Sequence, residues 1–237
     1  MVKEKGILPR HVAIIPDGNR RWAKIHNRKP WDGHKEGAKC TEEIISASRT
    51  MGIQHLSFWG SSLENMTKRS LEERRALLKI YVENFTKLIE NDDLHKNETR
   101  INIIGRWQEQ FPGPLVKVLQ KGITDTKEYK KRSLNFFLAY SGDDEMLGAV
   151  KVIAKNYGDP KEVTREVIKE NLMTAELPPV DFLIRTGNDP HLSAGFMMWD
   201  IANAQLFFAE QLYPDFDVAA FKNAIAQYGA RERRLGK

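Results

Sequence analysis

Short runs of apolar residues alternate along the chain with longer segments whose apolar positions recur at helical spacing. The short runs predict strands at 11–15, 54–59, 100–104, 133–139 and 181–185. The longer segments predict helices at 36–51, 70–91, 144–156, 164–171 and 218–228, with one more helix after the turn at 111–114. Strands separated by helices, without hairpin signals between them, favour a mostly parallel α/β sheet flanked by helices.

Local signals mark several of the predicted boundaries. Residues 70–73 read Ser-Leu-Glu-Glu, a capping-box pattern at the start of a helix, and Gly52 is a plausible C-cap for the helix before it. Pro16-Asp-Gly18 is a turn signal directly after the first strand. The chain shows no repeat, low-complexity segment or linker, so we expect one domain over residues 1–237.

Composition limits the class of protein. The chain has 237 residues with 41% hydrophobic ones, enough apolar material for a sizeable core. Its net charge is only +5 and the charges are interspersed, so small anionic ligands suit it and a nucleic-acid platform is not implied. One cysteine, Cys40, excludes an internal disulfide framework and a cysteine-based zinc cluster. No apolar run reaches the roughly 18 residues of a membrane span, and a signal peptide is missing, so we expect a cytoplasmic protein.

Three polar clusters follow predicted strands, at 16–21, 60–65 and 185–189. They combine carboxylates, amides, hydroxyls, glycines and arginines, a set that suits phosphate together with a magnesium ion. Turn and helix capping is the alternative interpretation for any single cluster, but three at consecutive strand ends favour a ligand site. The motifs typical of nucleotide hydrolysis, nicotinamide chemistry and serine hydrolases are absent from the sequence.

The histidines do not form a metal site by their spacing. We expect His11, His26, His55 and His95 to be structural or surface residues. His34 lies in Gly-His-Lys-Glu-Gly, residues 33–37, and is the one histidine that we keep as a site candidate.

Two long motifs resemble one enzyme family. Residues 11–24 (HVAIIPDGNRRWAK) and 33–37 closely resemble the opening signature of the cis-prenyltransferases, whose best-known members are the undecaprenyl diphosphate synthases. Residues 181–187 (DFLIRTG) and 212–216 (LYPDF) are similar to the closing signature of that family, and residues 231–234 to its tail. The resemblance runs from about residue 11 to the end of the chain.

The resemblance implies a single α/β domain with a parallel sheet, an apolar tunnel for the prenyl chain, and a homodimer. It implies a prenyltransferase in which an allylic prenyl diphosphate loses pyrophosphate with the help of Mg²⁺. A second, five-carbon isoprenoid diphosphate then attacks the first carbon of the allylic unit. Nucleic acid is not an implied partner, and any contact with a membrane would be transient, during product release.

The resemblance also implies roles for individual residues. Asp17 would be catalytic and would hold the metal, and Asn65 would be catalytic through proton handling. The residues expected to bind the substrates are Gly18, Asn19, Arg20, Arg21, Trp22, His34, Ser62, Glu64, Lys68, Arg185, His191 and Ser193. The tunnel would be built partly by one face of the helix 70–91, with Leu71, Leu78, Tyr81, Val82, Phe85 and Ile89.

The sequence departs from the family pattern mainly on the side of the second substrate. The departures are Pro30, Met66, Lys68, Asp143, His191 and Gln205, with one residue added at 194–195. Pro30 stands where an arginine is usual, and Arg28 and Lys29 lie close enough in sequence to replace it. His191 replaces an arginine and Gln205 a metal-binding glutamate, so an arginine fork and a carboxylate are lost.

Three functions remain open. The intact segment 17–21 favours ionisation of an allylic diphosphate, and the altered second-substrate side slightly favours irregular, head-to-middle coupling to dimethylallyl diphosphate. Ordinary cis elongation with isopentenyl diphosphate is the first alternative. A catalytically weak lipid-binding or scaffold subunit is the second.

Overall fold

The computed structural model of the chain describes residues 7–62, 64 and 69–230. Its strands form one six-stranded sheet in the order β3-β4-β2-β1-β5-β6, and all neighbouring pairs are parallel. The strands are β1 (His11–Ile15), β2 (His55–Trp59), β3 (Thr99–Ile104), β4 (Arg132–Phe137), β5 (Phe182–Arg185) and β6 (Gln205–Phe208). The predicted parallel α/β sheet is therefore confirmed, and the short edge strand β6 adds to it.

Helices connect the strands close to the predicted positions. They are α1 (Asn19–Ile25), α2 (Pro30–Met51), α4 (Leu71–Ile89), α5 (Asp92–Lys96), α6 (Trp107–Gln110), α7 (Gly113–Thr126), α8 (Gly142–Asn156), α9 (Arg165–Glu170) and α10 (Val218–Ala230), with the 3-10 turns η1 (Pro160–Glu162) and η2 (Tyr213–Asp215). The N-cap of α4 is Ser70, whose hydroxyl accepts the backbone N–H of Glu73 at 3.2 Å. Gly52 ends α2 in the left-handed conformation, as predicted.

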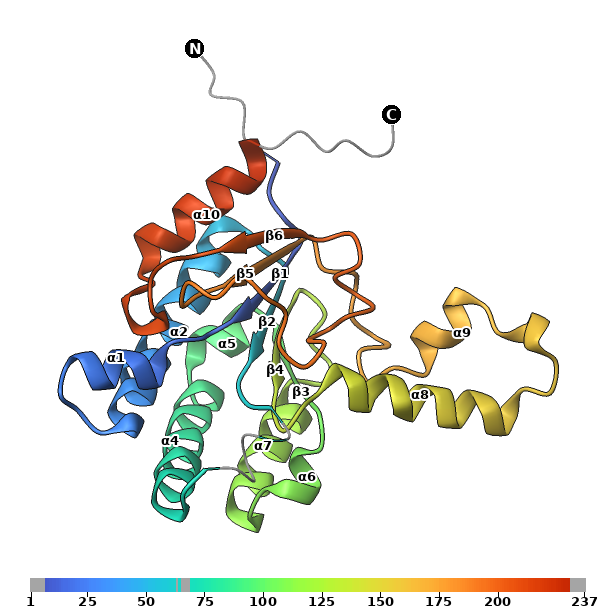
Figure 1. The fold of residues 1–237 in the computed structure, drawn as a ribbon, viewed down its shortest axis with the longest axis horizontal. Coiled ribbons are helices and arrows are strands. Elements are labelled where there is room, and N and C mark those ends of the chain that lie inside the picture. Colours follow the sequence, from blue (N-terminus) through green and yellow to red (C-terminus); the bar gives the residue numbers. More distant parts are fainter. Residues whose placement is uncertain (1–6, 63, 65–68, 231–237) are drawn as a thin grey trace.

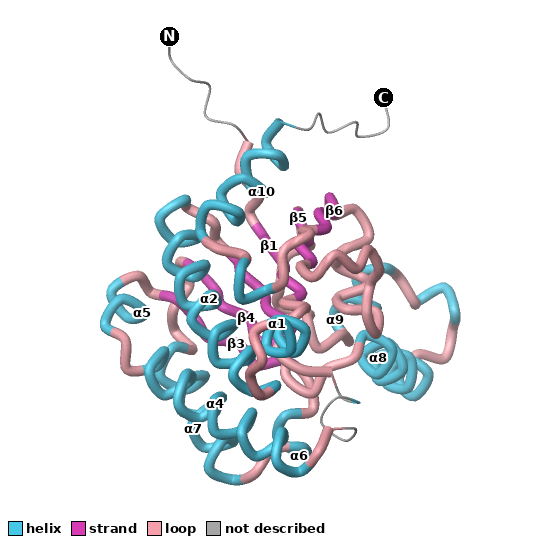
Figure 2. Tube along the Cα trace, turned by 60° about the vertical axis from the view of Figure 1, so that its left-hand side comes forward, coloured by secondary structure: helices cyan, strands magenta, loops and turns pink. Residues whose placement is uncertain are grey.

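Both faces of the sheet are covered. In β1, Val12 and Ile14 belong to a core formed with α2, α4, α7 and α10, while Ala13 and Ile15 face a second core against the segment 177–201. Figures 1 and 2 show the helices of the first layer gathered on one side of the strands. Burial on both faces explains why the strands are continuous apolar runs.

The sequence analysis was partly wrong about the inner face of α4. Leu71 is 69% exposed because it lies in the first turn of the helix, beyond the packed layer. Leu77 and Ile80, which were not predicted, are buried instead, together with the predicted Phe85 and Ile89. The other predicted residues, Leu78, Tyr81 and Val82, are partly buried and pack against the same core, so among the six only Leu71 was wrongly placed.

In the described ranges, no helix is both long and apolar enough to cross a membrane. Helices α8 and α9 extend away from the sheet on the right of Figure 1.

Candidate active site

A polar cavity of about 390 Å³ opens at the carboxyl ends of β1, β2 and β5. This is where parallel sheets usually bind ligands. The predicted site residues that line it are Asp17, Gly18, Asn19, Arg20, Arg21, His34, Ser62, Arg185 and Ser193. The structure thus brings together side chains from all three polar clusters that follow predicted strands.

Asp17 lies two residues after β1, between two arginines. Its Oδ2 accepts Nη2 of Arg185 at 2.8 Å, and its Oδ1 lies 3.3 Å from Nη2 of Arg21. The backbone oxygen of Asp17 accepts the Thr186 hydroxyl at 2.8 Å and the backbone N–H of Tyr213 at 3.0 Å. The carboxylate is about one third exposed, so it is both fixed in position and accessible to a ligand.

Helix α1 begins directly after Asp17 and packs tightly against α2. Gly18, with φ of 110°, makes the turn into α1 in a conformation that favours glycine. A Cβ at Gly33 would lie 2.0 Å from the backbone oxygen of Asn19, and one at Gly37 would lie 2.2 Å from its Oδ1. These close approaches explain why glycines flank His34 and place His34 beside the start of α1.

Arg185, the last residue of β5, is only 3% exposed and connects four acceptors. Its Nη1 donates to the backbone oxygen of His191 and to Oγ of Ser193, both at 2.8 Å. Its Nη2 donates to Asp17 at 2.8 Å and to Asp189 at 3.2 Å. The buried Nε is without a partner among the described residues. Arg185 therefore links the metal-binding candidate Asp17 to the loop that follows β5.

A hydrogen-bonded chain joins three side chains of that loop. Nδ1 of His191 lies 2.7 Å from Oδ1 of Asp189, and its Nε2 lies 3.1 Å from Oγ of Ser193. The hydrogen bond to His191, reinforced by the charge of Arg185, lowers the pKa of Asp189. His191 itself is exposed and touches the cavity only through Ser193. The histidine at the position where the family has an arginine is thus held in place by its neighbours.

The loop after β2 is fixed by hydrogen bonds to the end of β4. The Ser61 hydroxyl oxygen accepts a hydrogen bond from the backbone N–H of Ala139 at 2.9 Å. The backbone carbonyl oxygen of Ser61 accepts one from the backbone N–H of Tyr140 at 3.1 Å. Tyr81 of α4 donates its hydroxyl to the oxygen of Gly60 at 2.8 Å. These contacts hold Ser62 at the edge of the polar cavity.

His34 and Arg69 both line the polar cavity and contact each other. Nη1 of Arg69 lies 3.2 Å from Nε2 of His34. Burial, and then the charges of Arg69 and Arg20, lower the pKa of His34 to about 3. His34 is therefore neutral at physiological pH and can only accept this hydrogen bond through Nε2. Arg69 was missed by the sequence analysis, since its contact with His34 depends on the packing of α4 against α2.

Several predicted residues do not reach the cavity. Trp22 donates its indole N–H to Asp215 at 2.7 Å and stacks on His26, so it anchors α1 to η2. Glu64 and Asp143 are exposed and do not line the cavity. Asn65, Met66, Lys68 and the tail 231–234 lie outside the described residues.

The suggestion that Arg28 or Lys29 replaces an arginine at position 30 finds no support in the structure. Arg28 lies over the Trp22 ring and within 3.7 Å of Glu36, and Lys29 lies over the ring of Trp31. Neither side chain lines the polar cavity.

Gln205 lies at the other end of the sheet from the cavity. It is the first residue of β6 and pairs with Phe182, whereas Arg185 pairs with Phe208 at the carboxyl end. Three residues along a strand span about 10 Å, so within one chain Gln205 cannot join the Asp17 cluster. The sequence analysis grouped Gln205 with the second-substrate side, and the geometry of a single chain does not support that grouping.

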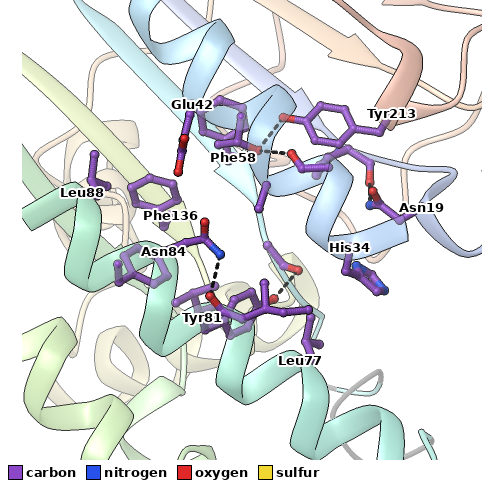
Figure 3. A pocket seen from close by; sticks show the side chains of 18 of the residues that line it. Asn19, His34, Glu42, Phe58, Leu77, Tyr81, Asn84, Leu88, Phe136 and Tyr213 are labelled. Atoms are coloured by element: carbon purple, nitrogen blue, oxygen red, sulfur yellow. Dashed lines mark hydrogen bonds between the residues drawn. The ribbon is translucent and has the colours of Figure 1, made fainter. Parts of the chain in front are cut away.

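An apolar cavity of about 130 Å³ adjoins the polar one between α2, α4 and the sheet. Figure 3 shows Leu77, Tyr81, Asn84 and Leu88 of α4 facing it, with Phe58 and Phe136 contributed by the sheet. Two of its polar side chains are paired within the protein, since Asn84 donates to the backbone oxygen of Ile80 and Thr41 bonds to Tyr213. Most of the other lining residues are apolar, so the walls offer a largely hydrocarbon environment, with Glu42 as a charged residue among them. The two cavities share Pro16, Asn19, His34 and Gly60.

The residues present fit a metal that is bound together with a diphosphate. Within the part of the chain that the structure describes, no group of three or more His, Cys, Asp or Glu side chains is placed to hold a metal ion. Magnesium does not require such a group, since it commonly takes one or two carboxylates and completes its shell with phosphate oxygens and water. Asp17 is a carboxylate of this kind, at the mouth of a cavity rich in arginine.

Comparison with known sequences identifies the family. The family model described as "Putative undecaprenyl diphosphate synthase" matches residues 15–236. A geranylgeranyl-diphosphate-specific tritrans,polycis-undecaprenyl-diphosphate synthase of Pyrococcus horikoshii is 37% identical, over 99% of this chain and 89% of the relative. An isoprenyl transferase of Porphyromonas gingivalis is 35% identical, over 98% of this chain and 91% of the relative.

A solved structure has the same fold. Lavandulyl diphosphate synthase from Lavandula x intermedia, in complex with dimethylallyl diphosphate, superposes with a TM-score of 0.88 at 27% sequence identity. The match covers 97% of this chain and 99% of that one.

Proposed function

Because the chain belongs to the undecaprenyl diphosphate synthase family and is therefore a prenyltransferase, we propose that it ionises an allylic prenyl diphosphate and joins it to a second five-carbon isoprenoid diphosphate. Pyrophosphate is released. The observation that carries the proposal is the junction of the two cavities. A charged cavity and a hydrocarbon cavity that share Pro16, Asn19, His34 and Gly60 suit a molecule with a diphosphate head and a prenyl tail.

The residues of the polar cavity would hold the leaving group. Arg20 and Arg21 extend from α1, and together with the backbone N–H groups near Gly18 they offer positive charge to the diphosphate. Asp17 would hold Mg²⁺, which when bound neutralises charge that develops on the leaving oxygen. The apolar side chains that line the neighbouring cavity, such as Phe58, Leu77 and Phe136, would keep water from the reacting carbon.

The size of the apolar cavity supports a short prenyl tail. A cavity of about 150 Å³ holds one benzene ring, so the 130 Å³ here fits a tail of about five carbons. Ile45 and Leu88 separate this cavity from a second one of about 50 Å³ at the amino ends of the strands. Dimethylallyl diphosphate therefore fits as the allylic substrate without displacement of these two side chains.

We further propose irregular, head-to-middle coupling with dimethylallyl diphosphate as the acceptor. Two observations support it. His191, where the family has an arginine, is tied to Asp189 and Ser193, so it offers no fork to a diphosphate. The structural similarity to a lavandulyl diphosphate synthase bound to dimethylallyl diphosphate points the same way. The second candidate is cis elongation with isopentenyl diphosphate, favoured by the names of the Pyrococcus relatives.

The product separates these functions. We expect a branched ten-carbon alcohol when the chain is supplied with Mg²⁺ and both five-carbon diphosphates and the products are dephosphorylated and identified by mass spectrometry and NMR. The reason is that the acceptor diphosphate lacks the arginine contact that His191 replaces. We therefore expect the acceptor to bind in a different position from isopentenyl diphosphate in the family, so that a different carbon faces the allylic cation. A linear cis-polyprenol would refute the irregular coupling and leave cis elongation. No prenyl product from any allylic substrate would favour the binding-subunit alternative.

We also propose that the chain forms a homodimer. Strand β6 is one edge of the sheet, and its Phe208 is 36% exposed. Leu147 and Val150 of α8 are 52% and 55% exposed, and these neighbouring apolar side chains form an exposed pair that a partner subunit would cover.

We expect light scattering to give twice the chain mass of 27.3 kDa, and Phe208→Glu to shift the measured mass toward that of the monomer. The control is Ile25→Glu, which adds the same charge at an exposed position of α1. A monomeric native chain would contradict this.

A further inference from the structure

A charged cluster forms where the start of α4 meets α1 beside the polar cavity. The cluster consists of Glu73, Arg69 and Arg20. Glu73 is 5% exposed and lies among apolar neighbours such as Leu77 on the inner face of α4. A carboxylate at this depth is costly unless cations accompany it.

The two cations reach Glu73 from different elements. Nη1 of Arg69 and Nε of Arg20 each lie 3.5 Å from its Oε1. This oxygen has no hydrogen-bond partner among the described residues, so both contacts are ion pairs at longer range. The negative charge of Glu73 therefore offsets the repulsion between the two arginines and keeps them close together. Their N–H groups remain available as hydrogen-bond donors, because Oε1 of Glu73 accepts no hydrogen bond from either of them.

Arg69 is oriented by a second acceptor. Its Nη1 donates to the neutral Nε2 of His34 at 3.2 Å. The side chain is only 13% exposed, yet it lines the same cavity as Asp17, Arg20 and Arg21. A guanidinium has five N–H donors, and the contacts with Glu73 and His34 account for only one nitrogen. Among the described residues, Nε and Nη2 make no hydrogen bond or ion pair, so they can serve a ligand in the cavity.

From this geometry we infer that Arg69 is a diphosphate-binding residue of the allylic site, and that Glu73 is the residue that positions it together with Arg20. The inference rests on the proposed function, since it names a further contact of the same allylic substrate. Glu73 acts only through the arginines, because it is buried behind them and its charge would repel a diphosphate. The preorganised pair lowers the cost of ordering two long side chains when the ligand binds.

The test uses inorganic pyrophosphate as the probe. Isothermal titration calorimetry with Mg²⁺ is expected to show binding by the wild-type chain, and a Kd raised about 10- to 100-fold by Arg69→Ala, as for loss of a charged hydrogen-bonding partner. Arg69→Lys keeps the charge but not the planar fork, so we expect a smaller loss. Glu73→Gln should weaken binding as well, because it frees both arginines. The matched control is Arg75→Ala, which removes an exposed arginine from α4, six residues after Arg69, and should leave the Kd unchanged.

Melting temperatures of all variants separate misfolding from lost binding, and Arg69→Gln serves as a second variant if Arg69→Ala does not fold. Wild-type affinity in a folded Arg69 variant would overturn the inference, as would a wild-type chain that does not bind pyrophosphate. Product formation by the wild type tests the proposed function separately. A chain that makes no product but loses pyrophosphate affinity in Arg69→Ala alone supports the inference and refutes the proposed activity.

Discussion

Replacement of Asp17 by alanine is expected to lower kcat on the order of 10³-fold, comparable to the loss of a main electrostatic stabiliser of a transition state. Asp17 is the carboxylate at the mouth of the polar cavity, and it would hold the metal against the leaving pyrophosphate. The fold should survive, since the side chain is about one third exposed and its backbone contacts with Thr186 and Tyr213 remain. Pyrophosphate release from an allylic diphosphate measures the effect.

Asp17→Asn distinguishes charge from shape. The amide keeps the size of the side chain and can still contact Arg185, but it is a poor ligand for Mg²⁺. We expect it to be nearly as inactive as Asp17→Ala. Asp125→Ala is the control, because among the described residues the ion pair of Asp125 is with Lys121 on the surface of α7, away from the cavity. Loss of a metal-binding carboxylate is expected to leave about a thousandth of the native rate. An Asp17 variant that keeps more than about a tenth of the native rate would therefore exclude Asp17 as the metal-binding residue.

Arg185→Met should affect stability and activity together. The change removes the donor for Asp17, Asp189, Ser193 and the backbone of His191. Breaking a buried ion pair costs about 3–5 kcal/mol, and the partial exposure of both aspartates reduces this to about 2–3 kcal/mol here. We expect kcat to fall on the order of 10²-fold or more, since Asp17 and the loop after β5 lose their common anchor.

Urea unfolding measures the loss of stability, and a double-mutant cycle with Asp17→Ala tests the coupling. The two changes should be less than additive, because each removes the same 2.8 Å contact. Arg100→Ala removes an arginine from a surface pair with Glu176 and should cost less than about 1 kcal/mol. Additive effects of the Asp17 and Arg185 variants would show that the arginine does not act through Asp17.

The alternation of short apolar runs and helical segments predicted most of the fold. Strand β1 begins and ends where the pattern placed it, because a strand buried on both faces is a continuous apolar run. Helix α1 was missed, since its seven residues carry charges and begin at a left-handed glycine instead of a capping residue. Strand β6 was missed because an edge strand of four residues leaves little pattern to detect.

The polar residues at the strand ends were predicted as a site because parallel strands share one edge. Asp17, Ser62 and Arg185 line one cavity for this reason. Contacts that depend on helix packing were not predictable in the same way. The pairing of Arg69 with His34 requires the position of α4 relative to α2, which no local pattern contains. The position of Gln205 depends on the register of β6 against β5, which is likewise a property of the assembled sheet.

The neighbours of β1 in the sheet have a consequence for how the chain is made. Strand β1, which leaves the ribosome before β2 and β5, pairs with β2 on one side and with β5 on the other. The contact between Asp17 and Arg185 joins positions 168 residues apart. At typical rates of synthesis this separation corresponds to roughly 10 to 30 s, during which one edge of an apolar central strand has no partner. The nascent chain is therefore exposed to wrong strand pairing until β5 emerges, and the contact between Asp17 and Arg185 cannot form before then.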